Sequence, residues 1–226
     1  MQNRVLRFLP DHSIGELQVR TIGSSEDWVE FAEAKGEINI PASKEVCLNV
    51  SAWAVFDPSI FSKLEPDALS VFEWVSTSYV TDDAIKHIEH LSGLHGVALW
   101  ETGITDEALW HLRQLSDLRW LDIGDTNITD NGLAYLKELA SLDYLSLLSD
   151  QITDRGLAHF EKLPKLSHLD LGWTPITDQA VEPLSRVRSL RRLRVYETRV
   201  TEVGYKELKR KLRECRISFY HPHRYI

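Results

Sequence analysis

Apolar residues recur along most of the chain with a fixed period of 24 residues. In phase with this period, an LxxLxL-type pattern begins at Leu94, Leu118, Leu142, Leu166 and Leu190. The dipeptide Thr-Asp keeps the same spacing at residues 81, 105, 129, 153 and 177, and Thr201 with Glu202 completes the series. Such a repeat predicts a solenoid, in which each unit is one coil that buries its apolar face only against its neighbours.

Each repeat divides into a strand and a helix. Within LxxLxL the apolar positions alternate with others, so we expect the apolar side chains to point into the core and the rest onto an open sheet. The Thr-Asp pair then predicts a helix start, with the hydroxyl accepting from free amides and the carboxylate at the positive end of the helix dipole. Leu109, Leu112 and Leu115 follow at three-residue spacing and give the buried face of one such helix.

These repeats, as in TNITDNGLAYLKELASLDYLSL, resemble the leucine-rich-repeat family from about residue 46 to the C-terminus. They are similar to a bacterial class and to the repeats of F-box proteins. The resemblance implies an α/β horseshoe with a parallel concave sheet, helices on the convex side and partner binding on the concave face. Where many members carry Asn after the strand, this chain carries Thr102, Thr126, Thr174 and Thr198, with Ser78 and Asp150 at the remaining positions.

The hydroxyl groups at this position suggest a ladder along the stack. Short hydroxyl side chains readily bond nearby backbone groups. We therefore expect them to bond backbone groups in the turns of neighbouring coils, in place of the family's asparagine amides.

The two ends of the repeat array differ from its middle. Residues 1–45 show strand-like alternation in GELQVRTI and GEINIP, separated by turn residues, which predicts a β-rich N-terminal cap. F-box domains are helical, so the ubiquitin-adaptor role of the F-box relatives is not implied. Residues 46–226 form the predicted repeat domain of about six to seven coils, closed by a polar coil that carries Lys211. Trp74 and Leu99 are 25 residues apart, which indicates one inserted residue in the first coils.

Composition limits the cellular setting. A chain of 226 residues with 43% hydrophobic content can bury a core as one domain. It contains no apolar run of the roughly 18 residues that cross a bilayer, and charge and proline interrupt its first residues, so we expect a cytoplasmic protein. Cys47 and Cys215 lie far apart without metal-ligand spacing, which favours buried free thiols.

The net charge of −8 is unevenly distributed. Residues 1–185 hold 13 Lys and Arg against 30 Asp and Glu, whereas residues 186–226 hold 13 against 4. The overall sign argues against nucleic acid as a partner. The polarity favours salt-dependent contacts with another protein or between copies of this chain.

The outward positions of the strands hold the candidate binding residues. Large aromatic residues there are not required by the repeat, and Trp, Tyr and Arg often dominate interface energetics. We therefore predict a non-catalytic module that binds another protein on its concave face; cross-strand packing is the alternative explanation of the aromatic residues. The predicted binding residues are Trp100, Glu101, Trp120, Asp122, Tyr144, His168, Asp170, Trp173, Arg192, Arg194 and Tyr196.

Two further functions fit parts of this surface. The aromatic and acidic positions could bind a glycan such as peptidoglycan. His168 and Asp170 share a strand face, and Ser146 is level with Asp170 on the next strand, which resembles a hydrolase triad. Because a nucleophile elbow and an oxyanion-hole loop are missing from the sequence, we expect no catalytic site.

Metal-binding patterns are weak, and we expect neither a metal nor a cofactor. His87 and His90 are three residues apart on a predicted helix, but they and the equivalent His111 are expected to face solvent. Glu101, Asp122 and Asp125 lack the spacing of an EF-hand calcium loop.

Overall fold

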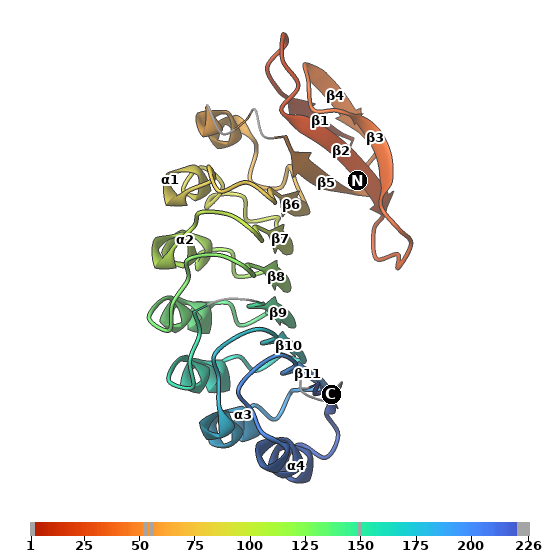
Figure 1. The fold of residues 1–226 in the computed structure, drawn as a ribbon. Helices are drawn as coiled ribbons and strands as arrows, with labels where there is room; N and C mark the ends of the chain where they lie inside the picture. The colour runs from red at the N-terminus through yellow and green to blue at the C-terminus, as the bar shows by residue number, and fades with distance from the viewer. Residues whose placement is uncertain (1–2, 52–53, 55–56, 149–150, 221–226) are drawn as a thin grey trace.

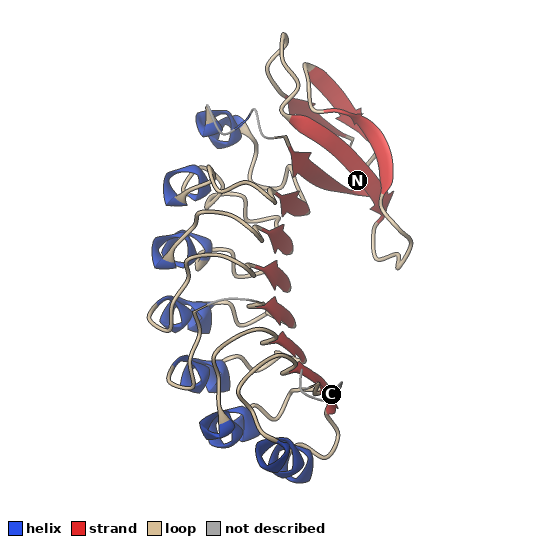
Figure 2. Cartoon of the chain, in the orientation of Figure 1, coloured by secondary structure: helices blue, strands red, loops and turns tan. Residues whose placement is uncertain are grey.

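The protein forms a curved stack of coils in the computed structural model, which describes residues 3–51, 54, 57–148 and 151–220 (Figure 1). Strands line the inner side of the curve and helices line the outer side (Figure 2). The predicted α/β solenoid with a parallel concave sheet and convex helices is therefore confirmed. Asp150, one of the residues expected in the hydroxyl ladder, lies outside the described residues.

Among the described residues, eight parallel strands form the concave sheet. Their pairing preserves the 24-residue period, as between Trp120 and Tyr144, except that Val71 and Gly96 are 25 residues apart, as the spacing of the first coils predicts. The strands are β5 (Lys44–Val50), β6 (Val71–Glu73), β7 (Gly96–Ala98), β8 (Trp120–Asp122), β9 (Tyr144–Ser146), β10 (His168–Asp170), β11 (Arg192–Arg194) and β12 (Arg216–Ser218).

The convex side mixes α-helices with 3-10 helices. Leucine spacing predicts which face is buried but does not distinguish the two helix types, because a single turn of either presents residues three apart on one side. The α-helices are α1 (Asp82–Ile85), α2 (Asp106–Leu112), α3 (Val181–Arg186) and α4 (Glu202–Lys211). The 3-10 helices are η2 (Pro58–Lys63), η3 (Gly132–Glu138), η4 (Gly156–Lys162) and η5 (Asp178–Ala180).

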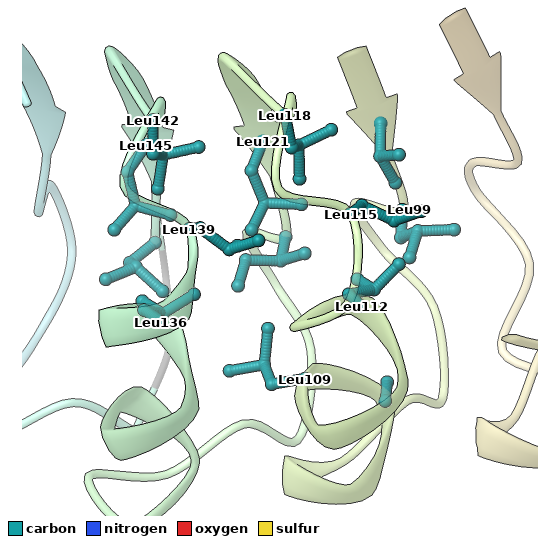
Figure 3. Close-up of a cluster of buried hydrophobic side chains, with 14 of the residues drawn as sticks. Leu99, Leu109, Leu112, Leu115, Leu118, Leu121, Leu136, Leu139, Leu142 and Leu145 are labelled. Carbon is teal, nitrogen blue, oxygen red and sulfur yellow. The ribbon is translucent and has the colours of Figure 1, made fainter. Parts of the chain in front are cut away.

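The core lies between the sheet and the helices and continues from coil to coil. Leucines of α2, such as Leu109 and Leu112, face those of the strands, and the next coil repeats the arrangement with Leu136 and Leu145 (Figure 3). These side chains are at most 1% exposed. Since burying a leucine contributes about 1.5–3 kcal/mol, stacking of coils supplies the main stabilisation of the fold.

The N-terminal residues extend the same sheet. Strand β2 (Gly15–Thr21) pairs antiparallel with β5, and β3 (Val29–Glu33) pairs antiparallel with β2, while β1 (Arg4–Arg7) and β4 (Glu37–Ile40) form a separate two-stranded sheet. These strands project from the first coil on the concave side (Figure 1). The predicted boundary between residues 45 and 46 falls inside β5, so the cap and the first coil share one strand.

Thr-Asp pairs connect neighbouring coils. The expected cap forms in α2, where the Thr105 hydroxyl accepts from the Glu107 amide, although Thr81 makes no such side-chain bond. Each Asp, however, also reaches the next coil: Asp106 accepts from the Thr129 amide at 2.7 Å and from the Thr129 hydroxyl at 2.8 Å. The same two bonds join Asp82 to Thr105, Asp130 to Thr153, Asp154 to Thr177 and Asp178 to Thr201.

The hydroxyl groups after the strands act within their own coil. Each donates to the carbonyl three residues earlier, as Thr102 does to Leu99 at 2.6 Å, and Thr126, Thr174 and Thr198 repeat this bond. The role expected of them between coils is thus carried by the Thr-Asp pairs. The assignment of Ser78 to this position is wrong, because Thr77 pairs with Thr102; the inserted residue lies in the following turn.

The C-terminal coil is polar, as its sequence predicts. Lys211 replaces an apolar residue of earlier repeats and pairs with Glu182 of the preceding coil at 2.6 Å. Cys47 and Cys215 are free and buried, also as predicted. Within the described residues, no helix is long and apolar enough to cross a membrane.

Candidate functional site

Strand register arranges the predicted residues in two rows across the concave sheet. The first row runs along the starts of the strands and the second along their ends. Trp120, Tyr144, His168 and Arg192 are neighbours in the first row; Asp122, Ser146, Asp170 and Arg194 are neighbours in the second. The structure therefore brings the predicted aromatic, acidic and basic residues of these strands onto one continuous surface.

Aromatic rings of the first row stack across strands. The ring centroids of Trp120 and Tyr144 are 5.9 Å apart, and those of Tyr144 and His168 are 6.5 Å apart, with tilts near 30° in both pairs. All three side chains are half-buried. A Cβ atom added to Gly96 would lie 3.3 Å from the Trp120 ring, which shows how closely the indole covers that strand.

This stacking corrects one expectation from the sequence. The aromatic residues of the first row were expected to be dispensable for folding, whereas each ring covers part of its neighbour and Trp120 also covers backbone. Tyr196 behaves similarly, since a Cβ atom on Gly172 would lie 2.6 Å from its ring. Residues that the sequence predicts to bind a partner therefore also pack against one another across strands.

Trp100 and Trp173 follow their strands and are more accessible. Their side chains are 41% and 58% exposed. Trp173 also has a φ angle of +61°, in the left-handed region of backbone conformation. Residues other than glycine adopt this region at a cost of roughly 1–2 kcal/mol. The same turn position is left-handed in other coils, at Ser76, Glu101, Asp125 and Glu197. Glycine, the residue that favours this conformation, occupies none of these positions, so residue type does not predict the left-handed backbone.

Acidic groups on the surface are poorly solvated. Asp122 accepts from the Gly124 amide at 3.3 Å and is hydrogen-bonded to Ser146, yet burial raises the pKa of Asp122 above its ordinary value. Burial likewise raises the pKa of Glu73, at the end of β6 in the same row. Ionised carboxylates in these places oppose folding, and such groups tend to occur at functional sites.

Arginines occupy the C-terminal part of the surface. Arg194 Nη1 lies 2.9 Å from Asp170 Oδ2, and this ionic hydrogen bond raises the pKa of the guanidinium. Asp170 is 5% exposed and also accepts from the Gly172 amide at 3.0 Å. Beside the pair lies a hollow of about 170 Å³, lined by Tyr144, His168, Leu169, Asp170, Arg192 and Arg194.

The hydrolase arrangement does not form. His168 Nδ1 lies 2.6 Å from the hydroxyl of Ser167, which donates to Asp143. Asp170 is held by Arg194, and Ser146 is bonded to Asp122. Each proposed member of the triad thus has another partner, and the relay from serine through histidine to aspartate is not assembled.

Histidines of the helical side have structural partners. His87 Nδ1 lies 2.8 Å from the Ser62 hydroxyl, and His90 Nε2 lies 2.9 Å from the Leu64 carbonyl. His111 contacts Glu89 at 2.6 Å with a side chain only 12% exposed, so the expectation that it faces solvent is wrong. Throughout the described ranges, no three His, Cys, Asp or Glu side chains gather as metal ligands would, and this includes Glu101, Asp122 and Asp125.

Two charged residues of the concave rows were missed in the prediction from the sequence. Glu73 stands in the second row beside Ala98, and Arg216 stands in the first row beside Arg192. The repeat period itself could have identified them, since Arg216 follows Arg192 by 24 positions.

Comparisons with known proteins concern the repeats. A family model described as leucine-rich repeat matches residues 114–137 and 162–185. No curated protein sequence matches the chain. Among solved structures, it is similar to a leucine-rich-repeat protein of Leptospira interrogans (20% identity, 68% of this chain and 38% of that one, TM-score 0.48). It is also similar to an internalin of Listeria monocytogenes (20%, 69% and 48%, TM-score 0.48) and to internalin C2 of that organism (18%, 69% and 82%, TM-score 0.46). The chain spans less than half the length of the first two proteins.

Proposed function

Since this chain is a leucine-rich-repeat protein, we propose that it is a non-catalytic module that binds another protein on its concave sheet. Interaction with proteins is the general role of such repeats. The observation that carries the proposal is the exposure of Trp100 and Trp173 at the edge of a row of charged residues. Tryptophan and arginine are among the residues that most often form interface hot spots.

Energetic cost supports the same conclusion. Burial disfavours the ionised carboxylates of Asp122 and Glu73, although the Gly124 amide and Ser146 offset part of this cost at Asp122. A partner that supplies a cation or hydrogen-bond donors would offset the cost of holding these carboxylates ionised, and this cost is not offset in the same way in the unbound protein. Titratable groups whose charged form is disfavoured by burial tend to occur at functional sites.

A glycan is a less suitable ligand for the whole surface. Aromatic platforms and hydrogen-bonding carboxylates would suffice for sugars. The adjacent arginines Arg192 and Arg194 add a strongly charged region for which a neutral sugar has no complement, while protein interfaces use such charge for specificity and rapid association.

Site-specific cross-linking in cells of the native organism tests the proposal. A photoreactive phenylalanine analogue replaces Trp173, or in a second variant Trp100. The control position is Trp110, which is 40% exposed but lies on α2 at the convex side. The proposal expects a protein adduct from positions 100 and 173 and none of the same mass from position 110. An adduct formed only from position 110, or a carbohydrate adduct from the concave positions, would overturn it.

A further inference from the structure

Two arginines at the C-terminal end of the concave sheet lie directly opposite one another. Arg192 of β11 pairs with Arg216 of β12 in register, and both side chains are exposed. Like charges at opposed positions of neighbouring strands are destabilising. In the part of the chain that the structure describes, neither guanidinium lies within ion-pair distance of a carboxylate. No carboxylate of the described residues therefore neutralises this pair.

Arg194 adds an oriented guanidinium to the same place. Its Nη1 atom is held by buried Asp170, which fixes the side chain, and the side chain stays 53% exposed. A guanidinium has five N–H donors, so one bond to Asp170 leaves further donors available. The hollow of about 170 Å³ begins beside it, with Arg192 and the Tyr144 ring in its lining.

The charge of the surroundings selects the kind of anion. The whole chain carries a net charge of −8, and Glu73 and Asp122 continue the same row toward the N-terminus. A polyanion that covered the whole concave face, such as nucleic acid, would meet these carboxylates. A short acidic group confined to the last strands would meet only the arginines.

We propose that the hollow beside Arg192 and Arg194, with Arg216 at its flank, receives carboxylate side chains from an acidic segment of the partner protein. Guanidinium and carboxylate form planar, bidentate pairs, and a hollow of this size fits side chains rather than a folded domain. The inference rests on the proposed function, because it specifies the partner's chemistry at one end of the concave surface.

A peptide titration with the purified full chain tests the inference without the partner. The probe is a fluorescein-labelled hexaglutamate peptide, followed by fluorescence anisotropy in about 0.1 M NaCl, where charges more than about 10 Å apart are largely screened. The test variant combines Arg192→Gln and Arg216→Gln. The control variant combines Arg155→Gln and Lys162→Gln, which remove the same charge from exposed positions at η4 on the convex side.

The expected result is a loss of about tenfold or more in affinity for the concave variant and less than about twofold for the control, since direct charge-assisted contacts are stronger than distant ones. Thermal melting should show that both variants fold, because the substituted side chains are exposed. Absence of peptide binding to the wild type, or equal losses in both variants, would overturn the inference. If hexaglutamate does not bind but a phosphoserine peptide binds in a manner that depends on Arg192 and Arg216, the carboxylate proposal is overturned and the ligand is a phosphoryl group.

The peptide assay separates this inference from the proposed function. Cross-links from Trp173 without any peptide binding would leave the concave interface standing and remove the acidic segment. Peptide binding that depends on Arg192 and Arg216, combined with cross-links only from Trp110, would keep the anion site and remove the concave protein interface.

Discussion

The bond pair between Asp106 and Thr129 provides a direct measure of how strongly neighbouring coils are coupled. Asp106→Ala removes both acceptors and leaves the partly buried Thr129 amide and hydroxyl without them. Hydrogen bonds to charged groups contribute about 1.5–3 kcal/mol each, and partial exposure of both groups lowers the sum. We therefore expect Asp106→Ala to reduce the free energy of unfolding by about 2–3 kcal/mol.

Urea denaturation followed by far-ultraviolet circular dichroism measures this loss. Asp117→Ala is the matched control, because Asp117 is exposed and follows the same helix. Thr129→Val removes only the hydroxyl bond and a long capping contact, so it should cost about 1 kcal/mol. The two losses should not add, since the variants share one bond, and the expected coupling is about 1 kcal/mol. If Asp106→Ala were no more destabilising than Asp117→Ala, the carboxylate would not connect the coils.

Three further predictions concern two side chains whose charged form is disfavoured by burial and one residue in a left-handed backbone conformation. Burial raises the pKa of Asp122 above its ordinary 3.8, so the free energy of unfolding of the wild type falls as pH rises from 3.8 through the folded-state pKa. Asp122→Asn lacks this titration, so its stability relative to the wild type should increase with pH over the same interval. A difference in unfolding free energy that does not depend on pH would contradict the prediction. Burial lowers the pKa of His95 below 6.5, so the folded state binds fewer protons and stability falls on acidification below that value; His95→Gln should flatten this part of the pH profile, and an identical profile would refute the assignment. Glu101→Asn should raise the free energy of unfolding by about 0.5–1 kcal/mol, because asparagine tolerates the left-handed backbone better. Urea denaturation measures this gain, and a lower free energy of unfolding than in the wild type would contradict it.

The repeat period made most of the fold predictable. Alternation within LxxLxL determines which side chains are buried. Because equivalent positions of successive coils are 24 residues apart, the period also determines which residues share a row, as Trp120, Tyr144 and His168 do. The Thr-Asp capping role was predictable for the same reason. The second role of these pairs was not predictable, since the bonds that Thr129 donates to Asp106 depend on how far apart the coils stack, which no property of a single coil reveals.

Other features depend on tertiary contacts. The stacking of Trp120 on Tyr144 requires ring orientations, and alternation supplies only the face. His111 is half-buried and contacts Glu89 of the preceding coil, although helical spacing alone places it at the surface. The cap strands showed their alternation in sequence, but their antiparallel pairing with β5 depends on a long-range choice of register.

The central claim is tested most directly by measuring how tightly the partner identified by cross-linking binds to variants of Trp100 and Trp173. Isothermal titration calorimetry would compare Trp100→Ala combined with Trp173→Ala against Trp110→Ala on the convex side, with unfolding measured for each. Concave binding predicts a loss of about 2 kcal/mol or more for the double variant, as for hot-spot residues, with stability nearly unchanged and the Trp110 variant binding as wild type does. Equal affinity of all three proteins for the partner would contradict the assignment of the concave sheet as the binding surface.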